Sequence, residues 1–254
     1  MEIPRHIAAI AQEGKLFAEA ARRSGLDAEV GCCPGWDVRE LVRHLSSVHL
    51  WAAAHVAKRA TVLTGDPALT QLMEYWPELA VFWPEDDKLI DWYLETNDNL
   101  VNELTEAPAD LECLTFLPAP TPLAMWARRQ AHETAIHRFD AEGSRSATAE
   151  YDPEFAADGI DEILMLFAPR WGIPTPETKT MVIRTTDTND TWHVTMGPEV
   201  ISVHRDEGRA DVTLTGSAPD LYLAVWNRGN PPITVTGDSE LVATWHENYK
   251  FMWD

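Results

Sequence analysis

Over the first 142 residues, apolar side chains recur every three or four positions, which is the spacing of one face of an amphipathic helix. This pattern predicts helices over residues 3–24, 38–60, 86–106 and 122–142. Residues 61–85 carry three prolines and several aromatic residues, so they predict an irregular connection with one short helix. Four helices of about twenty residues, with one long connection, are typical of a four-helix bundle.

Capping residues stand at the ends of these predicted helices. Asp37, with Glu40 three residues later, forms the pattern of a capping box. Thr121 and Pro122 are a suitable N-cap and first helical residue, and Gly143 is a suitable stop. The second and fourth helices are therefore expected to begin near residues 38 and 122.

After a small and polar stretch at 144–151, short runs of alternating apolar and polar residues appear, bounded by Asp, Asn and Gly. Such runs predict strands. They lie at 180–184, 192–196, 200–204, 212–215 and 233–236. Helical patterns begin at Asp152 and also cover 217–227 and 238–245.

The change of pattern predicts the α+β class with two domains. A four-helix bundle would occupy residues 1–146, and a smaller α+β domain with a mainly antiparallel sheet would occupy residues 150–254. The length of 254 residues suits two domains of about 100 to 150 residues each. An apolar fraction of 45%, with 11 tryptophans, supplies a core without disulfide bonds.

The charge of the chain narrows the classes of partner. A formal net charge of −21 argues against nucleic acid or an anionic membrane, because both are bound through clustered Lys and Arg. No signal-peptide pattern follows the first residues, and no stretch of about 18 apolar residues occurs. We therefore expect a cytoplasmic protein, either a monomer or a homodimer, with small-molecule partners.

The cysteines favour a reducing compartment. There are three, Cys32, Cys33 and Cys113, and their number and spacing do not form a disulfide scaffold. Cys33 has no histidine or basic cluster close to it in the sequence to activate it. We expect it to be a structural thiol rather than a nucleophile.

The segment from Ala131 to His137 holds candidate metal ligands. It imitates the zincin motif, but that motif needs two histidines four residues apart, and His132 and His137 are five apart. At about 100° per residue, their side chains point about 140° away from each other. Glu133 and His137 are four apart and share a face, so they form the candidate pair, and His132 is expected outside the ligand set.

The helix over 38–60 offers a third ligand. His44 and His55 lie on one continuous face, His49 lies off it, and about 16 Å of helix axis separates His44 from His55. Spacing alone does not choose between them, but only one can join Glu133 and His137. Two histidines and one carboxylate suit zinc, and three ligands leave a position open for catalysis. The alternative is that these histidines are hydrogen-bonded core or rim residues.

Two motifs and the second half of the chain resemble a known family. Residues 35–45, followed by His49, are similar to the second-helix motif of the mycothiol-dependent maleylpyruvate isomerase family, within the DinB-like bundle superfamily. Residues 128–142 resemble the fourth-helix motif of the same family. Short segments near residues 214–238 resemble its sterol-carrier-like C-terminal domain. The resemblance covers nearly the whole chain.

The resemblance implies a set of functional residues. A divalent metal, usually zinc, would be bound by His44, Glu133 and His137, with mycothiol as the thiol cofactor or co-substrate. We expect His49 to lie at the mouth of the pocket as a cofactor-binding residue. The resemblance also supports Arg228 as a catalytic residue that reaches an anionic substrate or cofactor group; the alternative is that Arg228 forms an ion pair between domains or at the surface.

The resulting prediction is an enzyme, a metal-dependent thiol transferase or isomerase. Its metal would activate a low-molecular-weight thiol as a thiolate, which then attacks a small electrophile. Two alternatives remain open: a metal-dependent hydrolase that activates water instead of sulfur, and a non-catalytic module that binds metal or a ligand.

Overall fold

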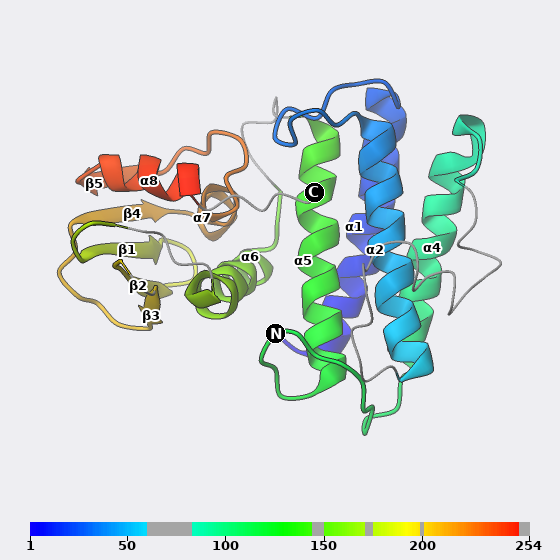
Figure 1. Cartoon of the computed structure of the whole chain (residues 1–254), viewed down its shortest axis with the longest axis horizontal. Coiled ribbons are helices and arrows are strands. Elements are labelled where there is room, and N and C mark those ends of the chain that lie inside the picture. Colours follow the sequence, from blue (N-terminus) through cyan, green and yellow to red (C-terminus); the bar gives the residue numbers. More distant parts are fainter. Residues whose placement is uncertain (60–82, 144–149, 171–174, 199–200, 249–254) are drawn as a thin grey trace. The chain divides into compact units, whose positions relative to one another are not determined.

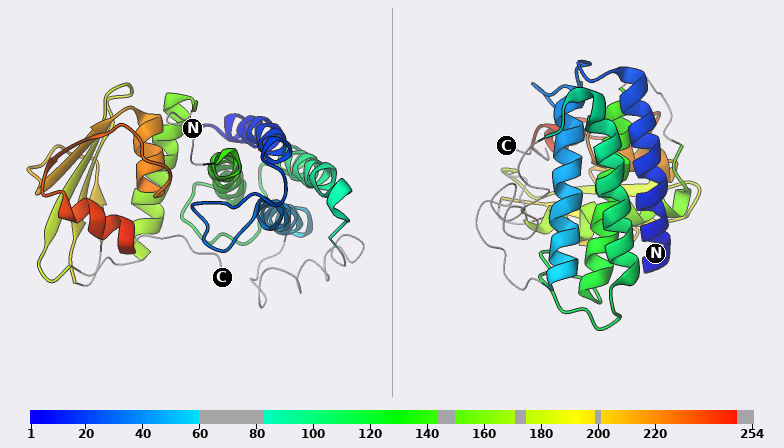
Figure 2. Two further views of the ribbon diagram at one scale, coloured as in Figure 1. Left: turned by 90° about the horizontal axis from the view of Figure 1, so that it is seen from above. Right: turned by 90° about the vertical axis from the view of Figure 1, so that its right-hand side faces the viewer.

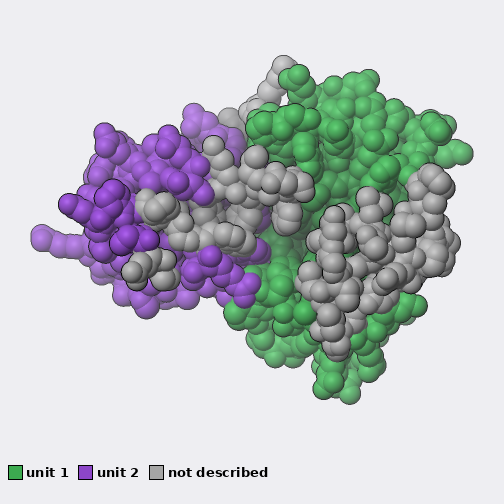
Figure 3. Space-filling view, in the orientation of Figure 1, with its two compact units in different colours: residues 1–143 green, residues 144–254 purple. Residues whose placement is uncertain are grey.

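The chain forms two compact units, Met1–Gly143 and Ser144–Asp254 (Figure 3). The structure, a computed structural model, describes residues 1–59, 83–143, 150–170, 175–198 and 201–248. Most of the predicted connection at 61–85 and of the polar stretch at 144–151 lies outside these residues. Among the described helices, none is long and apolar enough to cross a membrane.

In its described residues, the first unit contains four long helices that lie side by side (Figures 1 and 2). They are α1 (Ile3–Ser24), α2 (Val38–Lys58), α4 (Asp86–Glu106) and α5 (Pro122–Glu142). Helices α1 and α2 each pack against both α4 and α5. The predicted four-helix arrangement is therefore confirmed, with α2 ending slightly earlier than expected.

The predicted caps position two of these helices. The Asp37 carboxylate accepts a hydrogen bond from the Glu40 backbone nitrogen at 2.9 Å, and the Glu40 carboxylate accepts one from the Asp37 nitrogen at 3.0 Å. The Thr121 hydroxyl accepts from the Ala124 nitrogen at 3.1 Å. These bonds satisfy amide groups that the first helical turn leaves unpaired. They fix where α2 and α5 begin, and both helices carry candidate ligands.

Helices α1 and α4 approach closely at Gly14. A Cβ atom at this position would lie 2.4 Å from the side chain of Asn97, which is fully buried. Asn97 Nδ2 donates to the Ile10 carbonyl at 3.3 Å, so the side chain is held against α1. Nearby, Phe17 and Tyr93 pack with ring centroids 4.6 Å apart. The missing side chain of Gly14 lets the two helices share this part of the core.

The second unit begins with α6 (Pro153–Asp161), which continues as a π-helical turn, Glu162–Phe167, and a short 3-10 turn, Ala168–Arg170. Its described residues then form a five-stranded sheet in the order β3-β2-β1-β4-β5. The strands are β1 (Lys179–Thr185), β2 (Thr191–Met196), β3 (Ser202–His204), β4 (Val212–Gly216) and β5 (Thr234–Gly237). The remaining helices are α7 (Ala218–Val225) and α8 (Glu240–Asn248).

The sheet is mixed. β1 pairs with β2 in antiparallel and with β4 in parallel orientation, and the pairs β2–β3 and β4–β5 are antiparallel. The predicted α+β class and mainly antiparallel sheet are confirmed. The parallel pair in the described sheet joins β1 to a strand about thirty residues later, a pairing that alternation along a single strand does not reveal.

Candidate metal centre

Three side chains from two helices converge in the bundle. His44 comes from α2, and Glu133 and His137 come from α5. The Nε2 atoms of His44 and His137 lie 3.3 Å and 3.2 Å from Oε1 of Glu133. The two imidazole rings are 5.1 Å apart, and the candidate ligand atoms all lie within 4.8 Å of one another. The structure therefore brings together the three residues predicted as metal ligands.

Helix geometry explains this convergence. Glu133 and His137 are one turn apart on α5, so their side chains lie on one face of the helix. Helix α2 packs against α5, and Leu41 and Leu45, which flank His44 in sequence, are fully buried. The capping box at Asp37 sets the start of α2 and hence the direction in which His44 points.

The Glu133 carboxylate is ionised despite its burial. Burial by itself would raise its pKa, but His137, His44 and Arg129 together hold the pKa of Glu133 well below its usual range. Arg129 Nη2 donates to Oε2 at 2.8 Å, and both of these side chains are almost completely buried. Because Arg129 occupies Oε2, the other oxygen, Oε1, is directed toward the two histidines.

The two histidines have opposite electrostatic environments. Burial is the main cause that lowers the pKa of His44, so its ring is neutral at physiological pH. Burial also acts to lower the pKa of His137, but the neighbouring carboxylates of Glu133 and Asp140 outweigh it and raise that pKa to about 9. His137 Nδ1 lies 2.9 Å from Asp140 Oδ2, which leaves Nε2 facing Glu133.

The donor set fits a divalent metal. It consists of two imidazole nitrogens and one carboxylate oxygen, the ligand types that zinc and similar borderline ions accept. One carboxylate oxygen faces two ring nitrogens at once, and the three ligands come from rigid helices. The side chain of His44 is 15% exposed, whereas those of Glu133 and His137 are 2% and 1% exposed. Of the three side chains, that of His44 is therefore the most accessible to solvent.

The other histidines of α2 do not belong to this set. His49 is fully buried, and its Nε2 lies 2.9 Å from the Thr134 hydroxyl. Burial lowers the pKa of His49 to about 3. The expected position at a pocket mouth does not match this burial, and the assignment of His49 to cofactor binding stays a prediction. His55 bonds to the Trp51 carbonyl and packs on Trp126, as a core residue does.

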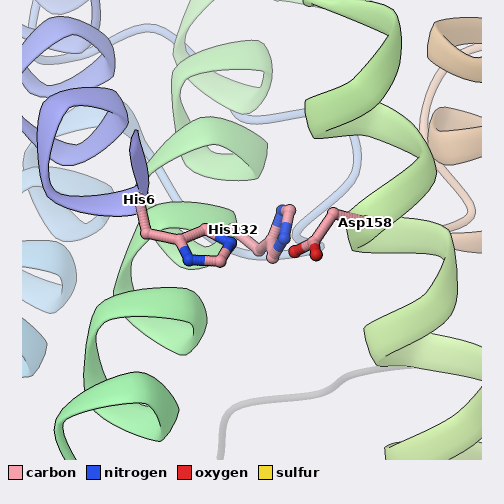
Figure 4. Close-up of side chains that lie close together, drawn as sticks. All are labelled: His6, His132 and Asp158. Carbon is pink, nitrogen blue, oxygen red and sulfur yellow. The ribbon is translucent and has the colours of Figure 1, made fainter. Parts of the chain in front are cut away.

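His132 does not join His44, Glu133 and His137. Its ring, on α5, meets the ring of His6 on α1 edge to face, with centroids 6.1 Å apart (Figure 4). The five-residue spacing from His137 turns it to another side of the helix. His132, the first histidine of the zincin-like segment, therefore lies on a different side of α5 from Glu133 and His137, the two residues that face His44.

Arg228 belongs to the second unit. It follows α7 and is buried, and its Nη1 donates to the Trp226 carbonyl at 3.1 Å. A catalytic role for Arg228 stays a prediction.

Sequence reasoning missed two partners of the ligands, Arg129 and Asp140. Both lie on α5 with Glu133 and His137, and the four residues are spaced four, four and three apart. This spacing follows one helical face, so the sequence held a signal for both. The spacing does not show which of these side chains pair with one another, because a charged stripe with the same spacing also occurs on exposed helices.

Fold and donor set together define a class of protein: a helical bundle with a candidate divalent-metal centre, followed by an α+β unit. Comparison with sequence families makes the class specific. The Mycothiol maleylpyruvate isomerase N-terminal domain matches residues 7–142, and the C-terminal domain of the same family matches residues 154–244. The chain belongs to the mycothiol maleylpyruvate isomerase family. Among curated proteins, no match was found.

Solved structures share the fold over most of the chain. One is the crystal structure of the mycothiol-dependent maleylpyruvate isomerase, and another is a histidine-to-alanine mutant of that enzyme. Each has a TM-score of 0.63 and 14% sequence identity, and each alignment covers 93% of both chains. At this identity, the likeness establishes the fold and leaves the reaction of this chain to be argued from its own residues.

Proposed function

We propose that this protein is a metal-dependent enzyme that activates a low-molecular-weight thiol, mycothiol, for attack on a small electrophile. The observation that carries the proposal is the convergence of His44, Glu133 and His137, of which His44 keeps 15% of its side chain exposed. Family membership supports the choice of thiol, because the related enzyme is described as mycothiol-dependent.

The chain's own residues prepare the ligands. His44 is kept neutral by burial, so its Nε2 has a lone pair available. Arg129 holds one oxygen of Glu133 and so orients the other toward the site. A divalent cation, most simply zinc, would lower the pKa of a coordinated thiol, so that the nucleophilic thiolate forms at neutral pH.

An aromatic side chain lies beside His44, the most exposed of the three candidate ligands. Trp36, which is partly buried, meets the ring of His44 edge to face, with centroids 5.0 Å apart. The indole ring of Trp36 beside a metal-bound thiol would exclude water and favour an electrophile with a flat, unsaturated carbon skeleton. Addition of sulfur to such a carbon leads either to an isomerised double bond, when the thiol leaves again, or to a stable S-conjugate.

The test combines metal analysis with thiol-dependent turnover. Purified protein should contain about one divalent ion per chain, and it should consume electrophiles such as maleylpyruvate only when mycothiol is present. His44→Ala and Glu133→Gln should lose both metal and turnover. His204→Ala, which changes an exposed histidine of β3, should retain both. Turnover without any thiol would instead favour a hydrolase, and full turnover in the two site variants would refute the proposal.

A further inference from the structure

We infer that Asp140 is a positioning residue for His137, and that the thiol of Cys32 holds Asp140 in place. This inference rests on the metal centre of the proposed function. Asp140 and Cys32 lie behind the metal ligands, and the half-buried cysteines of the loop before α2 thereby have a structural role at the site.

Asp140 has the position that this role requires. Its Oδ2 lies 2.9 Å from Nδ1 of His137, and the side chains of these residues are 0% and 1% exposed. A carboxylate can only accept hydrogen bonds, so Asp140 keeps a proton on Nδ1 and directs Nε2 toward Glu133. Partners of this kind orient metal-binding histidines and increase their basicity.

A thiol holds the second oxygen of the same carboxylate. Cys32 Sγ donates to Oδ1 of Asp140 at 2.8 Å, and Cys33 Sγ lies 3.9 Å from Oδ2. With one oxygen bound to His137 and the other to Cys32, the carboxylate cannot rotate without losing both bonds. The protein thus joins residues that are 108 positions apart in the sequence.

The loop that carries the thiols is itself fixed. Cys33 N donates to the Val30 carbonyl at 2.9 Å, Trp36 N donates to the Cys33 carbonyl at 3.0 Å, and Val30 N donates to the Trp36 carbonyl at 2.9 Å. The left-handed φ of +85° at Gly35 permits this tight turn. The same loop therefore reaches the metal centre twice, through Cys32 and Asp140 to His137, and through Trp36 to His44.

The alternative role for the two thiols is to bind a metal ion themselves. Cys32, Cys33 and Asp140 also lie within 4.8 Å of one another, close enough to hold a cation themselves. The observed contacts favour the positioning role, because Asp140 already accepts from His137 while Cys32 donates to it. Metal stoichiometry distinguishes the two roles.

The experiment uses the full chain loaded with Co²⁺, whose visible absorption reports ligand geometry, and measures Zn²⁺ affinity by competition with a chelator. Asp140→Ala should weaken Zn²⁺ binding about 10- to 100-fold and change the Co²⁺ spectrum. Cys32→Ala should cause a smaller loss, about 2- to 10-fold, as expected for one hydrogen bond. Cys32→Ser, whose hydroxyl still donates, should restore affinity, and Cys113→Ala is the control thiol that should change nothing. If Asp140→Ala does not fold, Asp140→Leu, which fills the space but has no hydrogen-bond acceptor, replaces it.

Three results would overturn the inference. Unchanged Zn²⁺ affinity and Co²⁺ spectrum in the Asp140 variants would show that His137 needs no partner. A lower melting temperature of the metal-free variants with an unchanged Co²⁺ spectrum would show a purely structural role. A second bound ion that disappears in Cys32→Ala would make the cysteines ligands themselves. Failure of the proposed function is recognised separately, because wild-type protein and His44→Ala would then bind Zn²⁺ equally.

Discussion

Glu133 is the residue on which the electrostatics of the bundle depend. Its carboxylate is 2% exposed and faces His44 and His137 through one oxygen and Arg129 through the other. A buried charge of this kind is tolerated only while its partners balance it. Removal of one of these partners should therefore lower the free energy of unfolding far more than removal of one partner of an ion pair at the surface.

Arg129→Met tests this dependence. The variant removes the 2.8 Å bond to Glu133 and leaves a buried carboxylate short of one partner, so the free energy of unfolding should fall by about 3 kcal/mol. Urea denaturation of the metal-free protein measures the change. Arg22→Met is the matched control, because its ion pair with Asp91 is exposed and should be worth less than about 1 kcal/mol. Equal losses in the two variants would contradict the prediction.

Glu13 predicts a pH dependence of stability. Burial raises its pKa from 4.5 to about 7, and the nearby Arg138 only partly opposes this. The folded state therefore holds a proton that the unfolded state releases between pH 4.5 and about 7, so this group's contribution to stability falls as pH rises through that window and is constant above it.

Glu13→Gln should remove this contribution. Between pH 4.5 and 8, the wild type should lose up to about 3 kcal/mol relative to the variant, as its raised pKa implies. Urea denaturation at several pH values gives the comparison, and Glu19→Gln, on the exposed side of the same helix, is the control. Parallel pH profiles for wild type and Glu13→Gln would show that Glu13 is not the group responsible.

At the scale of helices and strands, local signals were sufficient for the bundle. The starts of α2 and α5 follow from Asp37, Glu40 and Thr121, because a cap acts on amide groups within three residues of it. The ligand pair Glu133 and His137 also lies within one helix, where spacing determines the relative direction of side chains. These features could be predicted because they depend on near neighbours in sequence.

Features that join distant segments could not be predicted in this way. The parallel pairing of β1 with β4 and the contact of Cys32 with Asp140 depend on how the chain returns to itself. The complete burial of His49 likewise depends on which helices surround α2, whereas periodicity gives only its direction. The choice of His44 as third ligand came from the family resemblance, since spacing along α2 left His55 open.

The close contact of α1 with α4 gives a prediction at this scale. Gly14→Ala places a Cβ atom 2.4 Å from the buried Asn97 side chain, so α1 or Asn97 has to move. The free energy of unfolding should fall by about 1 to 3 kcal/mol, although alanine favours helices more than glycine does. A double-mutant cycle with Asn97→Ala provides the control: in that background Gly14→Ala should cost much less. An equal cost in both backgrounds would refute the steric explanation.

At the scale of the whole molecule, family membership establishes the fold, whereas the substrate depends on the residues of the site. Both family domains match the chain, and the solved isomerase shares its fold at 14% identity. Proteins related at so low a sequence identity can share a fold and differ in substrate. Under the proposed function, the electrophile should therefore be sought by assay of this chain, with variants of His44 and Trp36, rather than by transfer from the relative.

Metal removal should act on one unit only. The chain divides into two compact units, and the candidate ligands His44, Glu133 and His137 all belong to the first. A ligand that binds only the folded state stabilises it by about 4 kcal/mol at a thousand times its dissociation constant. Chelation should therefore accelerate hydrogen exchange in α2 and α5 and leave β1, β2 and β4 unchanged, as measured by mass spectrometry of peptides. His44→Ala protein, which lacks a ligand, should show no change in hydrogen exchange when the chelator is added. An equal acceleration of exchange in both units would contradict the prediction.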